Sequence, residues 1–307
     1  MKSRAKRDVP IPVAAMCPLC GSGKPRRLWE SSGASQVSAD QAFLCTTTER
    51  IRPEILECVS CSHVFSNPAT WPPDLEQEYE VLVDDEYLKM LPVKRRTFSR
   101  AADVLQRHVK PPASVLEIGS YAGLFLAECR SRGYEVVGVE PSAWGAQVAI
   151  DEGLQVIQGT AEHVLSSNSL GEFDAVVSWD VLEHVKDPAQ FINLLTCRVR
   201  KGGFVVISTL DRTNWFARLM GKRWPWYIPM HLHYFDQQSV LNMASSSGLN
   251  FIETAPHLHY TSGGYALQRL LRHGETINNK RHASLLERWI FPVGFGDVRL
   301  YVFEARQ

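Results

Sequence analysis

A carboxylate and two glycines stand at spacings that suit a nucleoside-containing ligand. Gly119 and Gly123 follow a mostly apolar run at 115–118, and Glu140 ends the next apolar run at 136–139. Glycine tolerates positive φ and has no side chain, so a bend built on it can approach a ligand closely. An acid about twenty residues after the first glycine can accept both hydroxyls of a ribose. These residues predict a nucleoside-containing cofactor at this edge; a tight turn that binds nothing is the alternative.

The glycine pattern argues against several nucleotide cofactors. A dinucleotide fingerprint would need glycines at 119, 121 and 124, but the chain has Tyr121 and Leu124. The second glycine is the one that brings the backbone close to a pyrophosphate, so NAD and FAD are disfavoured. The sequence also has no G-x-x-x-x-G-K-[ST] motif, so it gives no support to a phosphate cradle of the ATPase kind.

The pattern from Glu117 to Gly123, with Glu140 at the next strand end, resembles the class I S-adenosylmethionine-dependent methyltransferases. The segment 231–235, His-Leu-x-Tyr-Phe, is similar to the bacterial subgroup related to the ubiquinone-biosynthesis O-methyltransferases. The resemblance implies S-adenosyl-L-methionine as the cofactor, with Ala161 and Glu162 in the loop that flanks the adenine. The implied cofactor-binding residues are Glu117, Gly119, Ser120, Tyr121, Gly123, Glu140, Pro141, Ala161, Glu162, Trp179 and Asp180. Ser120-Tyr121 departs from the Cys-Gly or Gly-x-Gly of many members.

Methyl transfer is an in-line displacement in which the protein aligns the nucleophile and, for a hydroxyl, removes its proton. The candidate bases are His184, His231 and His233, because histidine titrates near neutrality. We expect His184 to lie one helical turn after Asp180, on the same face, and His231 occupies the family's His-Leu position. Each histidine could instead be structural. Asp180, Glu183 and His184 could instead hold a divalent ion that orients a hydroxylated substrate.

The expected acceptor is a small molecule, most simply a hydroxyl of a sugar, a polysaccharide precursor or a secondary metabolite. Transfer to nitrogen or carbon stays open, as does a zinc-ribbon interaction protein with a degenerate methyltransferase scaffold. Base methylation of DNA or RNA is disfavoured, because Trp179-Asp180-Val181 replaces an Asn-Pro-Pro-Tyr and no Pro-Cys nucleophile stands there. The balance of 33 basic and 33 acidic residues also makes nucleic acid an unlikely partner.

Four cysteines form two C-x-x-C pairs, Cys17 with Cys20 and Cys58 with Cys61, separated by residues 21–57. Two such pairs can complete a tetrahedral site, and four thiolates select Zn²⁺. A closed set of four ligands gives the metal a structural role, since no position is left for chemistry. Disulfides are disfavoured by a cytosolic setting, and a redox pair is disfavoured because no βαβ pattern surrounds either motif. Several members of the resembled family carry such a cysteine module.

The order of elements predicts an α/β fold. A Rossmann-like, mostly parallel seven-stranded sheet with helices on both faces would follow a small zinc-ribbon module. The expected regions are a disordered tail at 1–12, the ribbon at 13–68, a helical cap at 69–110 and the methyltransferase domain at 111–307. Within that domain we expect a lid at 211–235 and a helical insertion at 256–295, which could serve as a lid or as a homodimer contact. The final strand is predicted at 298–305.

Length and composition suit more than one globular unit. The chain has 307 residues, of which 45% are hydrophobic, so it can bury a full core. No apolar run reaches eighteen residues, and the charged N-terminus lacks the apolar stretch of a signal peptide. These features predict a soluble, cytoplasmic protein with no membrane span.

Overall fold

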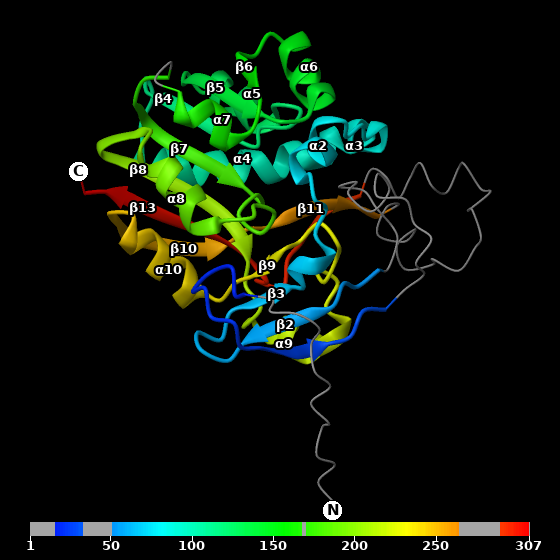
Figure 1. Ribbon diagram of the computed structural model, residues 1–307. Coiled ribbons are helices and arrows are strands. Elements are labelled where there is room, and N and C mark those ends of the chain that lie inside the picture. The colour runs from blue at the N-terminus through cyan, green and yellow to red at the C-terminus, as the bar shows by residue number, and fades with distance from the viewer. Residues whose placement is uncertain (1–15, 33–50, 168–169, 264–288, 307) are drawn as a thin grey trace, which may run out of the picture.

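The computed structural model describes residues 16–32, 51–167, 170–263 and 289–306. Its main feature is a seven-stranded sheet with the order β10-β13-β8-β7-β4-β5-β6 (Figure 1). The strands are β4 (Ser114–Ile118), β5 (Glu135–Glu140), β6 (Val156–Gln158), β7 (Phe173–Trp179), β8 (Val199–Leu210), β10 (Leu249–Pro256) and β13 (Val298–Ala305). β4 to β8 pair in parallel, whereas β13 runs antiparallel to both of its neighbours. The predicted fold class and the predicted last strand are confirmed.

The side chains of the strands alternate between the two faces of the sheet and help to form a hydrophobic core on each face. On β7, Ala175 and Val177 pack with α4 (Leu91–His108) and α5 (Leu124–Ser131) on one face. Val176 points to the other face, against α7 (Ala161–Ser166), α8 (Pro188–Thr196) and α10 (Gln237–Ser246). α6 (Ala143–Asp151) packs beside α5. Strands buried on both faces read as continuous apolar runs, which is why the parallel sheet is visible in the sequence.

The helices begin where side chains cap their first turns. Ser142, Thr160, Asp187 and Asp236 each accept a backbone N–H of the helix that follows, at α6, α7, α8 and α10. Such capping satisfies donors that have no partner within the helix. These caps therefore fix where each helix leaves the carboxyl edge of the sheet.

The strand order reverses between β4 and β7. From β4 the chain moves outward through β5 and β6, and then returns to β7 on the other side. Ligands of open α/β sheets bind in the crevice at the carboxyl ends of the strands, at this kind of reversal. The predicted cofactor residues lie in the last residues of β4, β5 or β7 or in the loops and the helix start that follow β4 to β7, so they are at this edge.

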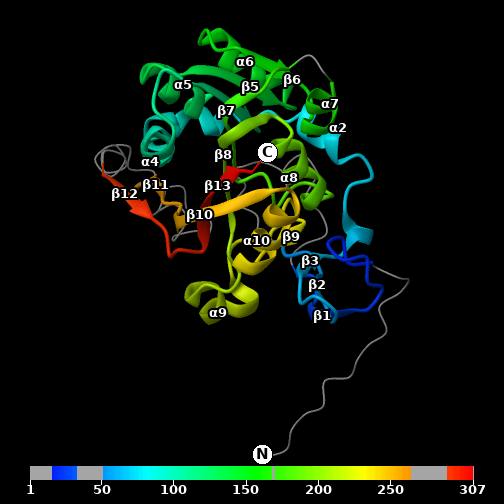
Figure 2. The same cartoon turned by 90° about the vertical axis from the view of Figure 1, so that its left-hand side faces the viewer.

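The N-terminal module is joined to the rest of the protein through a shared sheet. β1 (Pro25–Trp29), β2 (Ile55–Cys58) and β3 (Val64–Ser66) are antiparallel, and β9 (His233–Tyr234) adds a fourth strand beside β3 (Figure 2). The predicted lid at 211–235 therefore contributes a strand to the predicted zinc ribbon. The same segment holds α9 (Trp215–Met220) and the 3-10 helix η2 (Gly221–Arg223). In Figure 1 the module lies below the large sheet, next to α9.

The segment between module and sheet is helical, as predicted. It consists of η1 (Pro68–Thr70), α2 (Leu75–Glu80), α3 (Asp85–Lys89) and α4. The prediction of a helical insertion at 256–295 is wrong at its described ends, where β11 (His259–Ser262) pairs antiparallel with β12 (Ile290–Val293). Residues 264–288 and the predicted tail at 1–12 lie outside the described residues. Within the described parts of the chain, no helix is long and apolar enough to cross a membrane.

Candidate active site

The bend after β4 has the backbone that its glycines predict. Gly119 has φ of 76° and Gly123, which precedes α5, has φ of 71°. A Cβ on Gly119 would lie 2.5 Å from the Val181 side chain, so the bend packs tightly against the loop that follows β7. The amides of Gly119 and Ser120 both donate to the carbonyl of Val139 on the neighbouring strand. The turn is therefore fixed on both sides of the strand-order reversal.

Tyr121 takes a left-handed conformation, with φ of 44°, inside this bend. Its ring lies at a right angle to Tyr87 of the cap, with centroids 4.6 Å apart, and 5.6 Å from Trp144. A Cβ on Gly145 would come within 2.9 Å of the Tyr121 ring, so glycine at this position in α6 makes room for it. Tyr121 thus replaces a glycine of many family members, and Gly145 provides the space for its ring, which packs against Tyr87 of the cap.

Glu140 connects the bend to the start of α6. Its carboxylate accepts the Tyr121 N–H at 2.7 Å through one oxygen and the Ser142 N–H at 2.8 Å through the other. Burial raises the pKa of Glu140 to about 7, although both backbone donors lower it. An ionised carboxylate has about four acceptor sites, so two remain for ribose hydroxyls after these bonds are made. The residue therefore fits the role that the sequence predicts.

Unpartnered polar atoms gather around the same edge. Glu117 Oε2, Ser120 Oγ and Trp179 Nε1 are buried without a hydrogen-bond partner among the residues that the structure describes. Burial and the neighbouring Glu140 raise the pKa of Glu117 well above its ordinary value. Unsatisfied buried groups are costly and call for an explanation. S-adenosylmethionine has a cationic sulfonium and an ammonium group, which suit the Glu117 oxygen, and it has acceptor oxygens, which the Trp179 N–H needs. These residues therefore fit that cofactor.

The remaining predicted cofactor residues surround this position. Pro141 follows Glu140, and Ala161 and Glu162 begin α7 directly after β6. Trp179 ends β7 and packs on Phe125 of α5, with centroids 4.8 Å apart. The structure brings all of them to the carboxyl edge of the sheet. Their contacts with a cofactor stay a prediction.

Asp180 has φ of 54° and lies beside two histidines that the sequence analysis did not single out. The Asp180 carboxylate is 3.5 Å from Nε2 of His259, and the His257 and His259 rings have centroids 4.9 Å apart. Both histidines come from the segment after β10, which reaches this edge because β10 and β13 extend the sheet. The spacing His257-x-His259 is visible in the sequence, but nothing local connects it with Asp180.

His184 is not on a helix with Asp180. Residues 181–186 form a turn, and α8 begins only at Pro188, after Asp187 has capped it. His184 Nδ1 lies 2.9 Å from the Tyr79 hydroxyl of the cap and 3.0 Å from the Met230 carbonyl. The expectation of a shared helical face is therefore wrong.

Glu183, His184 and His231 form a second group, separate from Asp180. One potential ligand atom from each residue lies within 4.8 Å of the others. The sequence suggested that Asp180, Glu183 and His184 could hold one divalent ion. Among the described residues, Asp180 belongs to one group of possible ligands, and Glu183 and His184 belong to the other. Burial and the nearby Asp180 raise the pKa of Glu183 to about 8. This carboxyl group is therefore largely protonated at neutral pH.

The three predicted bases are all buried or half-buried. Burial lowers the pKa of His184 to about 4, of His231 to about 3 and of His233 to about 4. The rings are therefore neutral at pH 7. Both ring nitrogens of His233 are engaged, with His63 at 3.0 Å and with the Val185 carbonyl at 2.9 Å. This arrangement favours a structural role for His233 and leaves His184 and His231 as candidate bases.

The four cysteines of the N-terminal module converge. Sγ of Cys17 lies 3.7 Å from Sγ of Cys61, and Sγ of Cys20 lies 3.6 Å from Sγ of Cys58. A tetrahedral zinc site with bonds of about 2.3 Å has sulfur–sulfur edges of about 3.8 Å. The residue after each pair, Gly21 or Ser62, is left-handed, which closes the two tight turns. The predicted zinc-knuckle geometry is confirmed.

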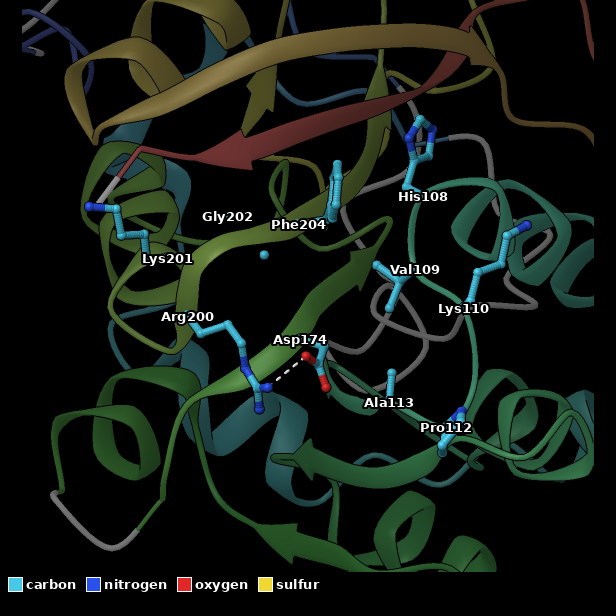
Figure 3. A pocket seen from close by; sticks show the side chains of 11 residues that line it. His108, Val109, Lys110, Pro112, Ala113, Asp174, Arg200, Lys201, Gly202 and Phe204 are labelled. Atoms are coloured by element: carbon cyan, nitrogen blue, oxygen red, sulfur yellow. Dashed lines mark ion pairs between the residues drawn. The ribbon is translucent and has the colours of Figure 1, made fainter.

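A shallow depression of about 280 Å³ lies away from these residues. It is lined by His108 at the end of α4, by Lys110, by Asp174 and Arg200 near the beginnings of β7 and β8, and by Phe204 of β8 (Figure 3). Arg200 forms an ion pair with Asp174 at 2.7 Å. These residues lie at the amino ends of the parallel strands, opposite the edge where ligands of such folds bind. The depression therefore has no part in the candidate active site.

Known proteins share this domain. Residues 93–254, more than half of the chain, match the family described as a methyltransferase domain. A mitochondrial ubiquinone biosynthesis O-methyltransferase of Dictyostelium discoideum is 29% identical over 143 residues, which cover 40% of this chain and 44% of that protein. The ubiquinone biosynthesis O-methyltransferase of Alkalilimnicola ehrlichii is 29% identical over 157 residues, which cover 45% of this chain and 64% of that protein. The matches thus span less than two thirds of these relatives.

A solved structure shows the same fold. It is a chain from the complex between the Haloferax volcanii Trm112 methyltransferase activator and the putative methyltransferase. The TM-score is 0.50 at 16% sequence identity, and the alignment covers 73% of this chain and 100% of that one. The similarity is one of fold alone.

Proposed function

The chain belongs to the methyltransferase-domain family, and from this premise we propose that it transfers a methyl group from S-adenosyl-L-methionine to a hydroxyl of a small molecule. The observation that carries the proposal is the meeting of the glycine bend, Glu140 and the Asp180 loop where the strand order reverses. The named activity of the relatives, O-methylation in ubiquinone biosynthesis, supports oxygen as the acceptor atom. A sugar or polysaccharide-precursor hydroxyl is our narrower proposal for the acceptor.

The roles follow from the positions of the side chains. Glu140 holds the ribose, the unpartnered Oε2 of Glu117 offers an acceptor at the end of β4, and Trp179 forms an apolar wall at the end of β7. The bound cofactor supplies an activated methyl group. The chain's own residues must align the acceptor oxygen, exclude water and take up the hydroxyl proton. We assign proton uptake to His184 or His231, whose ring centroids lie 4.8 Å apart next to the loop after β7.

The four-cysteine cluster is proposed to hold a structural Zn²⁺. Four thiolates complete the coordination, so the metal would contribute to folding and take no part in chemistry. The metal would therefore affect the reaction only indirectly, by stabilising the module whose strand β3 pairs with β9 of the methyltransferase domain.

Calorimetric titration with S-adenosylhomocysteine tests the proposed cofactor site. We expect binding by the wild-type chain and an affinity at least about tenfold lower in Glu140→Gln, because hydrogen bonds to a charged group contribute about 1.5–3 kcal/mol. Glu135→Gln, at the exposed start of the same strand, is the matched control and should bind as the wild type does. Thermal unfolding of each variant checks that the fold is kept.

The titration also distinguishes an enzyme from a degenerate scaffold. A wild-type chain that gives neither heat nor stabilisation with saturating S-adenosylhomocysteine would contradict the proposal and favour the interaction protein. With binding established, a panel of sugars and phenols assayed for methyl transfer separates the acceptor classes.

A further inference from the structure

We propose that Asp180, His257 and His259 bind a divalent transition-metal ion at the mouth of the active site. One potential ligand atom from each residue lies within 4.8 Å of the other two. Two histidines and one carboxylate form a ligand set that holds a metal on one side and leaves other coordination positions open. This set differs from the Asp180, Glu183 and His184 combination that the sequence suggested.

The polar atoms of the three side chains are only partly satisfied by the protein. Oδ1 of Asp180 accepts the Ser208 hydroxyl at 2.6 Å, and Oδ2 lies 3.5 Å from Nε2 of His259. Nε2 of His257 is buried and has no hydrogen-bond partner within the described part of the chain. A buried ring nitrogen without a partner is costly, and a cation between these atoms would satisfy it.

Surrounding groups fix the ligands in place. Ser208 donates to Asp180 and also accepts the Asp180 N–H at 2.9 Å, which holds the left-handed backbone. The His257 ring stacks on Trp179 with centroids 5.7 Å apart and an interplanar angle of 13°. Such supporting contacts orient the ligands of metal sites. The three side chains are therefore positioned by β7, by β8 and by the segment that leads into β11.

The charges suit a cation. The set combines one carboxylate, Asp180, with two imidazoles, His257 and His259. One anion and two neutral imidazoles are the forms that bind metal. The side chains of His259 and Asp180 are 30% and 33% exposed, so an ion has access from solvent.

The second group, Glu183, His184 and His231, is the weaker candidate. Its carboxyl accepts the Thr209 hydroxyl at 2.7 Å and has a raised pKa. Nδ1 of His184 and of His231 each lie against a main-chain carbonyl, of Met230 and of Trp226. A protonated carboxyl and ring nitrogens that already contact carbonyls are weaker ligands for a cation than Asp180, His257 and His259.

The position suggests what the metal would do, and this step rests on the proposed function. Asp180 follows β7 at the strand-order reversal, where the methyl group and the acceptor must meet. An acceptor oxygen bound to the metal would be held in place, and its hydroxyl would lose its proton more easily. The acceptor would then be a hydroxylated molecule that can coordinate a metal, as a phenol with a neighbouring oxygen substituent or a sugar diol can.

Manganese binding, followed by electron paramagnetic resonance, tests the site in the full-length protein. Mn²⁺ suits carboxylate-containing sites, whereas thiolate sites select zinc, so the cysteine cluster does not compete. We expect one bound Mn²⁺ per chain and an affinity at least about tenfold lower in the double variant His257→Asn, His259→Asn. His163→Asn, which changes an exposed histidine of α7, is the control and should bind as the wild type does.

Zinc stoichiometry provides the second measurement. After dialysis from excess zinc, the wild type should retain two ions per chain and the double variant one, held by the cysteines. A wild-type protein that binds no Mn²⁺ and keeps one zinc, or a folded double variant that binds both metals as the wild type does, would overturn the proposal. S-adenosylhomocysteine titration is run alongside: binding without the second metal refutes only this site, and the second metal without binding refutes only the proposed function.

Discussion

At the scale of single residues, strained backbone coincides with the proposed sites. Among the described residues, Ser62, Tyr121 and Asp180 are the non-glycine residues with positive φ. Ser62 closes the second cysteine turn, Tyr121 follows β4, and Asp180 follows β7, the two strands between which the strand order reverses. Such conformations persist only where surrounding contacts impose them, and they cluster at binding sites. At Tyr121 these contacts come from Glu140 and from the room left by Gly145.

Glu183 predicts a dependence of stability on pH. Its pKa is about 8 in the folded protein against an ordinary value of 4.5. A carboxyl whose pKa is raised by folding contributes stability that is complete below pH 4.5 and is lost as the pH rises through 8. Glu183→Gln stays neutral throughout, so the variant should gain stability relative to the wild type between pH 5 and 9. The gain is up to about 1.4 kcal/mol for each pH unit crossed.

Urea unfolding at several pH values measures this difference. Glu172→Gln, an exposed change just before β7, should show no such trend and serves as the control. If Glu183→Gln and the wild type keep a constant difference in unfolding free energy from pH 5 to pH 9, the carboxyl is ionised in the folded state and the raised pKa is wrong.

At the scale of elements, the cysteine module supports the loop that follows β7. His63, two residues after Cys61, contacts His233 of β9, and His233 contacts the Val185 carbonyl. The amides of Leu232 and His233 both donate to the Glu183 carbonyl. The β3–β9 pairing thus connects the cysteine turns to the loop that carries the candidate base His184.

Removal of zinc should therefore loosen this loop before it affects the large sheet. We expect a chelator to speed amide exchange at 231–235, because β9 loses an ordered neighbour when the cysteine turns open. Amides of β4, which are paired on both sides within the parallel sheet, are the internal control and should exchange as before. Equal protection of 231–235 with and without zinc, measured by mass spectrometry, would show that the module and the loop are independent.

The elements also show what the sequence could reveal. β13 was predicted at its observed bounds, because a strand that is buried on both faces leaves a local apolar pattern. The strands β9 and β3 pair although they lie about 170 residues apart in the sequence. The strands β11 and β12 are also far apart in the sequence. Neither pairing therefore leaves a local signal. His257 and His259 were missed for the same reason: only the folded sheet brings them to Asp180.

At the scale of the whole molecule, a further hydrophobic cluster joins the N-terminal module to the methyltransferase domain. Ile55 of β2 and Val64 of β3 pack in a cluster with Trp224 and Tyr234 from the segment before α10 and with Val298 of β13. Trp224 also donates to Asp297 at 3.0 Å. The boundary predicted at residue 68 therefore lies between two parts that share a hydrophobic cluster, and we expect these parts not to fold independently.

A chain that begins at residue 69 should consequently be unstable. It would leave β9 as an uncovered edge and expose the partners of Ile55 and Val64, and each such fully buried side chain contributes about 1.5–3 kcal/mol. For a domain of this size 1 kcal/mol corresponds to about 2–4 °C, so the midpoint of unfolding should fall by at least about 6 °C. A chain that begins at residue 16 keeps every described residue of the module and should unfold as the full-length protein does, in a single calorimetric transition. The chain that begins at residue 69 could instead keep both the full-length midpoint of unfolding and the affinity for S-adenosylhomocysteine. The shared cluster would then contribute nothing to stability, and the module would be a separate domain.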